Sequence, residues 1–290
     1  MKTLINILPR LATGSGLIAL VAWTLFKAPL WVFSVVTTAF IGLGLNEFFL
    51  LVERKGIVIE RWLGLGVGLL IPISILAGFE PTKGWELFFM VAVFLALFLT
   101  QMRRQDSSQA IIGISTALFG ILYVSWTLSF LIKLRFLESP VLPSGAWLVA
   151  LVLVITKGGD IGAYFVGSAI GRHTLVGRVS PSKTWEGMIG GLMFSVGGAL
   201  ALRGVFSRIP AVHLVVLGLL LGVLGQLGDL SESVVKRDCQ VKDAGTLFPG
   251  MGACWTCWTA CCSRPRSATS TFASFWWGPK DDPAPAELVL

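Results

Sequence analysis

Eight apolar segments, most of them about as long as a membrane is thick, constrain this chain more than any other feature. A helix needs about 20 apolar residues to cross the roughly 30 Å hydrocarbon core of a bilayer. Segments near that length occupy about residues 11–26, 29–51, 62–79, 85–101, 109–132, 143–165, 186–203 and 210–230. Only 13% of the 290 residues are charged, against about 25% in a soluble domain. The sequence therefore predicts an all-α polytopic integral membrane protein and excludes soluble, disordered and disulfide-rich secreted classes.

The basic residues are distributed unevenly over the loops. Lys and Arg number 23 against 16 Asp and Glu, so the net charge is +7. Cytoplasmic loops of membrane proteins are enriched in Lys and Arg. With the N-terminus inside, cytoplasmic loops hold Arg54, Lys55, Arg61, Arg103, Arg104, Arg172, Arg178, Lys183, Lys236, Arg237 and Lys242, while Lys133 and Arg135 run against the bias. The polar loops are thus predicted to face the cytoplasm, and the charge suits anionic lipid or phosphate rather than nucleic acid.

Two glycine patterns fall within the spans. Gly218, Gly222, Gly225 and Gly228 form a stripe along the last span, and such stripes let helices pack closely in lipid. The run Gly64-x-Gly66-x-Gly68 follows no strand, so it does not read as a nucleotide-binding loop. Both patterns are interpreted as packing features.

A first polar stretch begins inside an apolar segment at Lys157. Lys157 and Asp160 are three residues apart, so on a helix they share a face and can pair or bind one ligand. Ionisable groups at membrane depth are costly and usually functional. The alternative is a lysine that extends to the interface beside a partner.

The same stretch continues into the loop SPSKTWEG, residues 180–187. Its hydroxyl groups and Lys183 precede a helix start, where Glu186 suits the positive helix end. A helix N-terminus with a lysine would suit a phosphate. The simpler interpretation is that Ser182 or Thr184 caps the helix.

A second polar stretch, residues 228–252, interleaves acids and bases at the end of the last span. Asp229 and Glu232 are followed by a group of charged residues: Lys236, Arg237, Lys242 and Asp243. Carboxylates bind Mg²⁺, usually one or two of them together with substrate phosphates, and lysine and arginine neutralise phosphates. The pattern favours Mg²⁺-assisted phosphoryl or nucleotidyl transfer, with a solvated charged loop as the alternative.

These two stretches resemble the phosphatidate cytidylyltransferase (CDP-diacylglycerol synthase) family. SESVVKRDCQVKDAGTLFPGMG resembles the family signature S-x-x-x-K-R-x(4)-K-D-x-G-x-x-x-P-G-x-G-G, with Met251 where many relatives have His. SPSKTWEG resembles S-P-K-K-T-x-E-G, and the lysine followed by Asp160-x-x-AYF also matches. The resemblance covers roughly residues 100–252.

The resemblance implies an inner-membrane enzyme that forms CDP-diacylglycerol and pyrophosphate from CTP and phosphatidic acid. It implies Mg²⁺ as cofactor, with a monovalent cation such as K⁺ as a further candidate, and a homodimer. Candidate catalytic residues are Lys157, Asp160, Lys183, Glu186, Lys236, Arg237, Lys242 and Asp243; candidate substrate-binding residues are Ser180, Thr184, Ser231 and Arg237; candidate metal ligands are Asp229 and Asp243. Two alternatives stay open: a CTP-dependent lipid-alcohol kinase and a polytopic transporter.

The chain departs from the family pattern after Gly252. The family continues with D-x-x-D, whose first aspartate is expected to join Asp229 at the metal, but this chain has Thr256 and Thr259 there. Trp is encoded by TGG and Thr by ACN, so a shifted frame across each Trp-Thr pair reads GAC, which encodes Asp. Both aspartates reappear at the family spacing.

We therefore predict that residues 253–290 are an out-of-frame tail that replaces a ninth span and leaves this chain inactive or nearly so. The domain plan is then N-terminal spans at 1–135, a catalytic membrane region at 136–252, and the tail. The alternative is a Zn²⁺ or Fe–S site on Cys254, Cys257, Cys261 and Cys262.

Overall fold

The computed structural model describes residues 15–78, 85–103, 109–138, 143–177 and 180–240. Within these ranges every predicted span contains a helix. The helices are Ser15–Phe26, α2 (Leu30–Arg54), α3 (Arg61–Leu76), α4 (Trp85–Met102), α5 (Ala110–Gly120), α6 (Thr127–Phe136), α7 (Gly145–Ile170), α8 (Trp185–Ala201) and α9 (Ala211–Asp238). A π-helix, η1 (Ile121–Trp126), joins α5 to α6, and a 3₁₀ turn, η2 (Leu202–Gly204), follows α8.

The helix lengths and composition match the predicted class. Five helical segments in the described part of the chain are long and apolar enough to cross a membrane: Leu30–Arg54, Ala110–Phe136, Gly145–Ile170, Trp185–Gly204 and Ala211–Asp238. Large apolar side chains such as Trp62 and Ile111 are exposed on the outside of the bundle, as contact with lipid requires. The chain is an all-α polytopic membrane protein.

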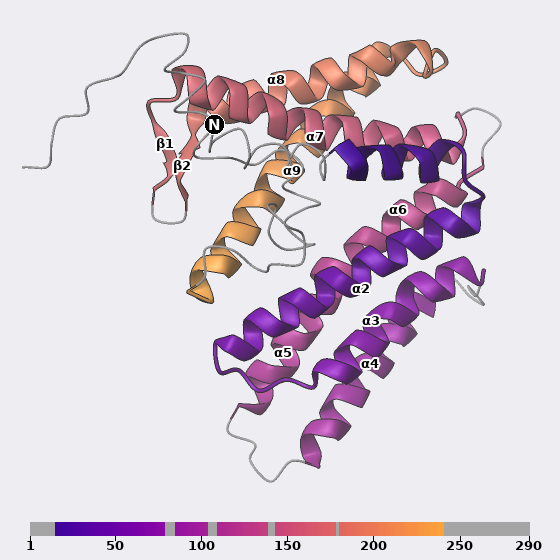
Figure 1. Cartoon of the computed structure of the whole chain (residues 1–290), viewed down its shortest axis with the longest axis vertical. Coiled ribbons are helices and arrows are strands. Elements are labelled where there is room, and N and C mark those ends of the chain that lie inside the picture. Colours follow the sequence, from indigo (N-terminus) through magenta and orange to yellow (C-terminus); the bar gives the residue numbers. More distant parts are fainter. Residues whose placement is uncertain (1–14, 79–84, 104–108, 139–142, 178–179, 241–290) are drawn as a thin grey trace, which may run out of the picture.

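One predicted loop contains a small β-hairpin instead. Strands β1 (Thr174–Val176) and β2 (Ser180–Thr184) pair antiparallel, with Thr174 opposite Thr184 and Val176 opposite Ser180. The hairpin lies between α7 and α8, at the end of the two helices (Figure 1). The sequence indicated a loop at these residues and did not predict that two strands would pair there.

Helices α2 to α6 form one half of the molecule (Figure 1). Their shared core includes Phe48 and Phe49 of α2 and Ile121 and Val124 of η1, all almost fully buried. The Ser125 hydroxyl donates a hydrogen bond to the Gly68 carbonyl and so links η1 to α3. Such interhelical hydrogen bonds supplement van der Waals packing where lipid provides no hydrophobic driving force.

In the other half, α7 and α8 lie side by side (Figure 1) and cross closely because glycines line their contact. A Cβ atom added at Gly162 would lie 2.4 Å from the Cβ of Phe194. The Ser195 hydroxyl donates to the Ile155 carbonyl at 3.0 Å. Helix α9 joins this layer through Gln226, whose amide donates to the Met188 carbonyl at 3.0 Å.

The C-terminal end of α9 leaves this layer and packs on the first half. Cys239, just beyond α9, is buried in the same core as Phe48, and Asp238 forms an ion pair with Lys55 in the loop after α2. Burial raises the pKa of the Cys239 thiol, and neighbouring Asp238 adds to that effect, so the thiol stays protonated at neutral pH. The loop after α2 and the end of α9 thus lie on one side of the bundle.

The predicted glycine stripe on α9 divides into two parts. A Cβ added at Gly218 would lie 2.9 Å from the Val196 Cα, and one added at Gly222 would lie 2.9 Å from Ser195. These two glycines pack against α8 as predicted. A Cβ added at Gly225 would make only ordinary contacts to Thr156, and one added at Gly228 would meet nothing within 4 Å, so the helix is in open space at Gly228.

This packing predicts opposite outcomes for one substitution at two glycines of the bundle. Gly162→Ala should destabilise the protein by about 1–3 kcal/mol because the new methyl group overlaps Phe194. Gly197→Ala adds the same methyl group on α8 where nothing lies within 4 Å, and should leave stability unchanged or slightly raised. Thermal unfolding in detergent measures both; equal melting temperatures would contradict the packing argument.

Candidate active site

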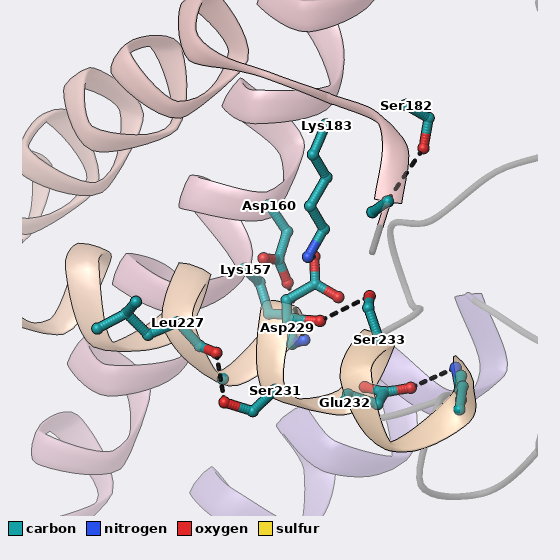
Figure 2. A network of polar contacts seen from close by, with 12 residues as sticks. Lys157, Asp160, Ser182, Lys183, Leu227, Asp229, Ser231, Glu232 and Ser233 are labelled. Atoms are coloured by element: carbon teal, nitrogen blue, oxygen red, sulfur yellow. Dashed lines mark hydrogen bonds and ion pairs between the residues drawn. The ribbon is translucent and has the colours of Figure 1, made fainter. Parts of the chain in front are cut away.

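Four predicted charged residues converge where α7, α9 and the hairpin meet (Figure 2). The Lys157 ammonium lies 3.1 Å from the Asp160 carboxylate on α7, which confirms the predicted pairing on one helix face. The Lys183 ammonium of β2 lies 2.8 Å from the Asp229 carboxylate of α9. Residues 157, 183 and 229 are far apart in sequence, so tertiary packing creates this cluster.

Lys183 reaches the cluster because the base of its hairpin, where β2 meets α8, is fixed. Thr184 caps α8, with the Gly187 N–H donating to its hydroxyl at 3.1 Å, which confirms the capping interpretation for Thr184. Glu186, in the first turn of α8, accepts bonds from the backbone N–H groups of Arg172 and His173 and lies 2.6 Å from His173 Nδ1. Glu186 thus holds the base of the hairpin and lies outside the four-residue cluster.

The next turn of α9 carries a second ion pair. Glu232 is almost fully buried, and its Oε1 lies 2.5 Å from the Lys236 ammonium. The other carboxylate oxygen, Oε2, is buried without a hydrogen-bond partner. The i, i+4 spacing of the pair was visible in the sequence, but Glu232 was not predicted as a site residue because only a structure shows its burial.

The remaining predicted residues play different structural parts. The Ser231 hydroxyl donates to the Leu227 carbonyl of its own helix at 2.8 Å. Arg237 is exposed near the end of α9, and the Ser180 hydroxyl lies 3.4 Å from that of Ser182. Lys242 and Asp243, the D-x-x-D positions, and the cysteine cluster lie outside the described residues.

Tyr123 of η1 also reaches the site. Its hydroxyl donates to the Gly228 carbonyl at 3.1 Å, next to Asp229 in α9. No sequence pattern indicated this residue, because its position depends on the π-helix and on the packing of α9 against the first half.

A cavity of about 300 Å³ begins at the charged cluster and extends into the apolar bundle. Lys157, Asp160, Asp229 and Tyr123 line one part of it. The rest is lined mainly by apolar side chains from the helix Ser15–Phe26, α2, α6 and α7, including Val21, Phe33, Leu131 and Val152. Along α7 and along the η1–α6 segment the lining changes from polar to apolar in the same spatial direction, so the cavity is amphiphilic along its length.

The charges of the cluster are balanced in pairs. Two ammonium groups and two carboxylates can each exchange their present partner for a ligand of opposite charge. The described residues hold no group of three or more His, Cys, Asp or Glu side chains placed to bind a metal. Asp160 and Asp229, which lie close enough to interact electrostatically, nevertheless fit Mg²⁺, because this ion is often bound by one or two carboxylates plus substrate phosphates.

Comparison with known proteins identifies one family. The model of the family described as "Cytidylyltransferase family" matches residues 8–254. A phosphatidate cytidylyltransferase of Synechocystis is 32% identical over 248 residues, 77% of this chain and 82% of the relative. One from Bacillus subtilis is 34% identical over 168 residues, 56% of this chain and 59% of the relative. An Escherichia coli protein, "Uncharacterized protein YnbB", is 33% identical over 211 residues, 72% of this chain and 68% of the relative.

The hairpin geometry gives a prediction that needs no substrate. Glu186→Gln removes the charge that three donors from residues 172 and 173 share, so backbone amides of the hairpin should exchange hydrogen several-fold faster. Glu138→Gln, an exposed position between α6 and α7, is the control and should leave exchange unchanged. Hydrogen-exchange mass spectrometry of peptides covering 172–184 measures this; equal rates would mean that Glu186 does not hold the hairpin.

Proposed function

Because the chain belongs to the cytidylyltransferase family, we propose that it transfers the cytidylyl group of CTP to phosphatidic acid. In this reaction a phosphate oxygen of phosphatidic acid forms a bond to the α-phosphorus of CTP. The bond from that phosphorus to the β-phosphate oxygen breaks, and CDP-diacylglycerol and pyrophosphate are the products. The observation that carries the proposal is that a paired lysine–aspartate cluster adjoins a cavity whose remaining lining is mainly apolar.

The amphiphilic cavity supports a lipid as the acceptor substrate. On α2 its lining extends from Phe33 to Gly44, a helical rise of about 16 Å at about 1.5 Å per residue. A lipid phosphate at the lysines would place an acyl chain along these apolar residues. Burial of the chain would favour binding by about 0.8 kcal/mol per methylene relative to water, although a chain leaving the bilayer gains much less.

The two lysines support phosphate binding. Lys157 and Lys183 come from different elements and point into the same space (Figure 2). An incoming phosphate can replace Asp160 or Asp229 as the partner of each ammonium group. Lysine donates up to three hydrogen bonds to such oxygens, and in a partly buried site its charge is screened little.

When a phosphate replaces Asp160 and Asp229 as the partner of the two lysines, these carboxylates become available to bind a cation. We propose that Asp229 and Asp160 hold Mg²⁺ together with CTP phosphates, with Asp243 as a further acidic residue and a monovalent cation such as K⁺ as an additional ion. When bound, Mg²⁺ would withdraw charge from the phosphate oxygens and stabilise the charge that develops during transfer. Glu232 and Lys236 lie one turn further along α9 and set the charge beside this site.

The location follows from the charge pattern. We propose that the site faces the cytoplasm at a bacterial inner membrane. In support, the loop after α2 contacts both the end of α9, through Lys55 and Asp238, and the start of α5, through Val58 and Gln109. These are three regions predicted to be cytoplasmic. Homodimerisation is an expectation from the family resemblance.

The reaction can be tested in nanodiscs that contain phosphatidic acid and α-³²P-labelled CTP. Label should appear in CDP-diacylglycerol, with release of pyrophosphate. Two forms are compared: the 290-residue chain, and a frame-restored chain encoded with one base inserted after the Gly252 codon. We expect activity in the frame-restored form and little or none in the other, because Mg²⁺ would lack one carboxylate ligand.

Each outcome has a distinct meaning. Equal activity in both forms would contradict the prediction about the tail. Release of CDP with a phosphorylated lipid alcohol would identify a kinase, and solute flux without CTP consumption would identify a transporter. Absence of any CTP turnover in both forms would overturn the proposed function.

The acidic residue of α9 gives a direct test of the site. Asp229→Asn in the frame-restored chain keeps the shape but removes the charge, and should lower kcat by about 10²–10³-fold, the usual cost of losing one preorganised electrostatic group. Glu138→Asn, an exposed residue between α6 and α7, is the control and should keep full activity. Full activity of Asp229→Asn would remove this carboxylate from the reaction.

The cavity predicts a change in lipid preference. Gly225→Val should project into the space beside Thr156 and lower kcat/KM for dipalmitoyl phosphatidate roughly tenfold relative to a dihexanoyl form, as expected when methylenes no longer fit a pocket. Gly197→Val makes the same change on the exposed side of α8 and should not alter this ratio. An unchanged ratio in Gly225→Val would show that the acyl chain lies elsewhere.

A further inference from the structure

We propose that Tyr123 is a positioning residue that fixes the turn of α9 carrying Asp229. The proposal rests on the proposed function, since it concerns how the Asp229 carboxylate is held for its cation and for CTP. It gives a positioning role to the half of the molecule formed by α2 to α6, the N-terminal half, which contributes none of the four clustered charges. The contact that carries it is the hydrogen bond from the Tyr123 hydroxyl to the Gly228 carbonyl at 3.1 Å.

The bond from Tyr123 reaches α9 at Gly228, where no neighbouring helix packs closely against it. Helix α9 packs on α8 through Gly218 and Gly222, but at Gly228 an added Cβ would meet nothing within 4 Å. Tyr123, Gly228 and Asp229 all line the cavity. The turn that carries Asp229 therefore lacks close side-chain packing on this face, and a polar bond from the opposite wall holds its backbone.

The π-helix gives Tyr123 a rigid base. Within η1, Ile121, Val124 and Ser125 are almost fully buried in the first half, and the Ser125 hydroxyl bonds to the Gly68 carbonyl of α3. The Thr127 hydroxyl donates to the Leu122 carbonyl five residues back, at 3.1 Å. π-Helical turns are rare and frequently occur at functional sites.

The tyrosine ring is also fixed in orientation. Phe119 stacks on it with ring centroids 5.3 Å apart and an interplanar angle of 10°. A hydroxyl at the end of a ring held in this way has few alternative positions. Its bond to Gly228 therefore restrains the α9 backbone instead of following it.

The restraint acts beside the bond from Gln226 to the Met188 carbonyl, which fixes the preceding turn of α9 on α8. The Asp229 carboxylate pairs with Lys183, which belongs to a short hairpin and which a phosphate would draw away. The Asp229 backbone carbonyl accepts a bond from Ser233 of the same helix at 2.9 Å. The bond from Tyr123 links this turn to the N-terminal half, and outer partners of metal ligands strongly affect metal affinity.

The test uses the full-length chain in whichever of the two forms turns over CTP. Tyr123→Phe removes one oxygen atom and keeps the ring. Ser129→Ala is the matched control, because it also removes one oxygen from the same span, where the hydroxyl bonds to the Ser125 carbonyl of its own segment at 2.7 Å. Mn²⁺ affinity in the presence of CTP is measured by electron paramagnetic resonance, and the Mg²⁺ concentration for half-maximal activity is measured separately.

We expect Tyr123→Phe to raise the Mn²⁺ dissociation constant and the half-maximal Mg²⁺ concentration about tenfold each, the lower end of the range for outer partners of metal ligands, with KM for phosphatidate changed less than about twofold. Ser129→Ala should leave all three values unchanged. 4-Aminophenylalanine at position 123 restores a donor at the same place and should recover most of the loss. Phe119→Leu keeps the hydroxyl but loosens the stack, so its effect should be smaller than that of Tyr123→Phe and in the same direction.

Three results would overturn the inference. Unchanged Mn²⁺ affinity in Tyr123→Phe would do so. A higher KM for phosphatidate at unchanged Mn²⁺ affinity would show that the hydroxyl contacts the substrate instead. If Tyr123→Phe fails to fold, unchanged Mn²⁺ affinity in Phe119→Leu, or a tenfold weaker Mn²⁺ affinity in the 4-aminophenylalanine variant, would do so as well. Absence of CTP turnover in every form is a different result, because it overturns the proposed function itself.

Discussion

The structure depends on pairing charged side chains inside a bundle that lipid surrounds. An isolated ion inside a transmembrane bundle is costly, so Lys157 on α7 is paired with Asp160, and Lys183 of the hairpin is paired with Asp229. Within each pair the two charges balance. They also hold the carboxylates and ammonium groups close together. A cation can then replace an ammonium group as the partner of a carboxylate, and a phosphate can replace a carboxylate as the partner of a lysine.

Small residues determine where the helices touch and where space remains. Glycines at 162, 218 and 222 allow backbones to approach so closely that an added methyl group would overlap a neighbour. Further along α9, Gly225 and Gly228 face the cavity instead. The first glycines of this stripe thus allow close α8–α9 packing, and the later ones leave space between the two halves of the molecule. This combination places the cavity directly beside the charged cluster.

The sequence predicted the features that depend on local spacing. Apolar length indicated the spans, the i, i+3 spacing predicted that Lys157 and Asp160 could pair, and the hydroxyl residues before an apolar run predicted a cap by Ser182 or Thr184, which the structure assigns to Thr184. It did not predict the hairpin, the buried orientation of Glu232 or the approach of Tyr123 to Gly228. Each of these depends on which distant segments pack together, and a periodic pattern in one segment contains no information about its neighbour.

The sequence by itself determined the class of the protein, the identity of the charged residues and the family motifs that contain them, because hydrophobic length and motif spacing are properties of contiguous residues. The tertiary structure decided which of those charges meet. Glu186 holds the hairpin, Lys183 reaches Asp229 from another element, and a tyrosine from the opposite half completes the wall of the site. Side chains far apart in sequence become neighbours only when helices pack, and the shapes of their contact surfaces determine that packing.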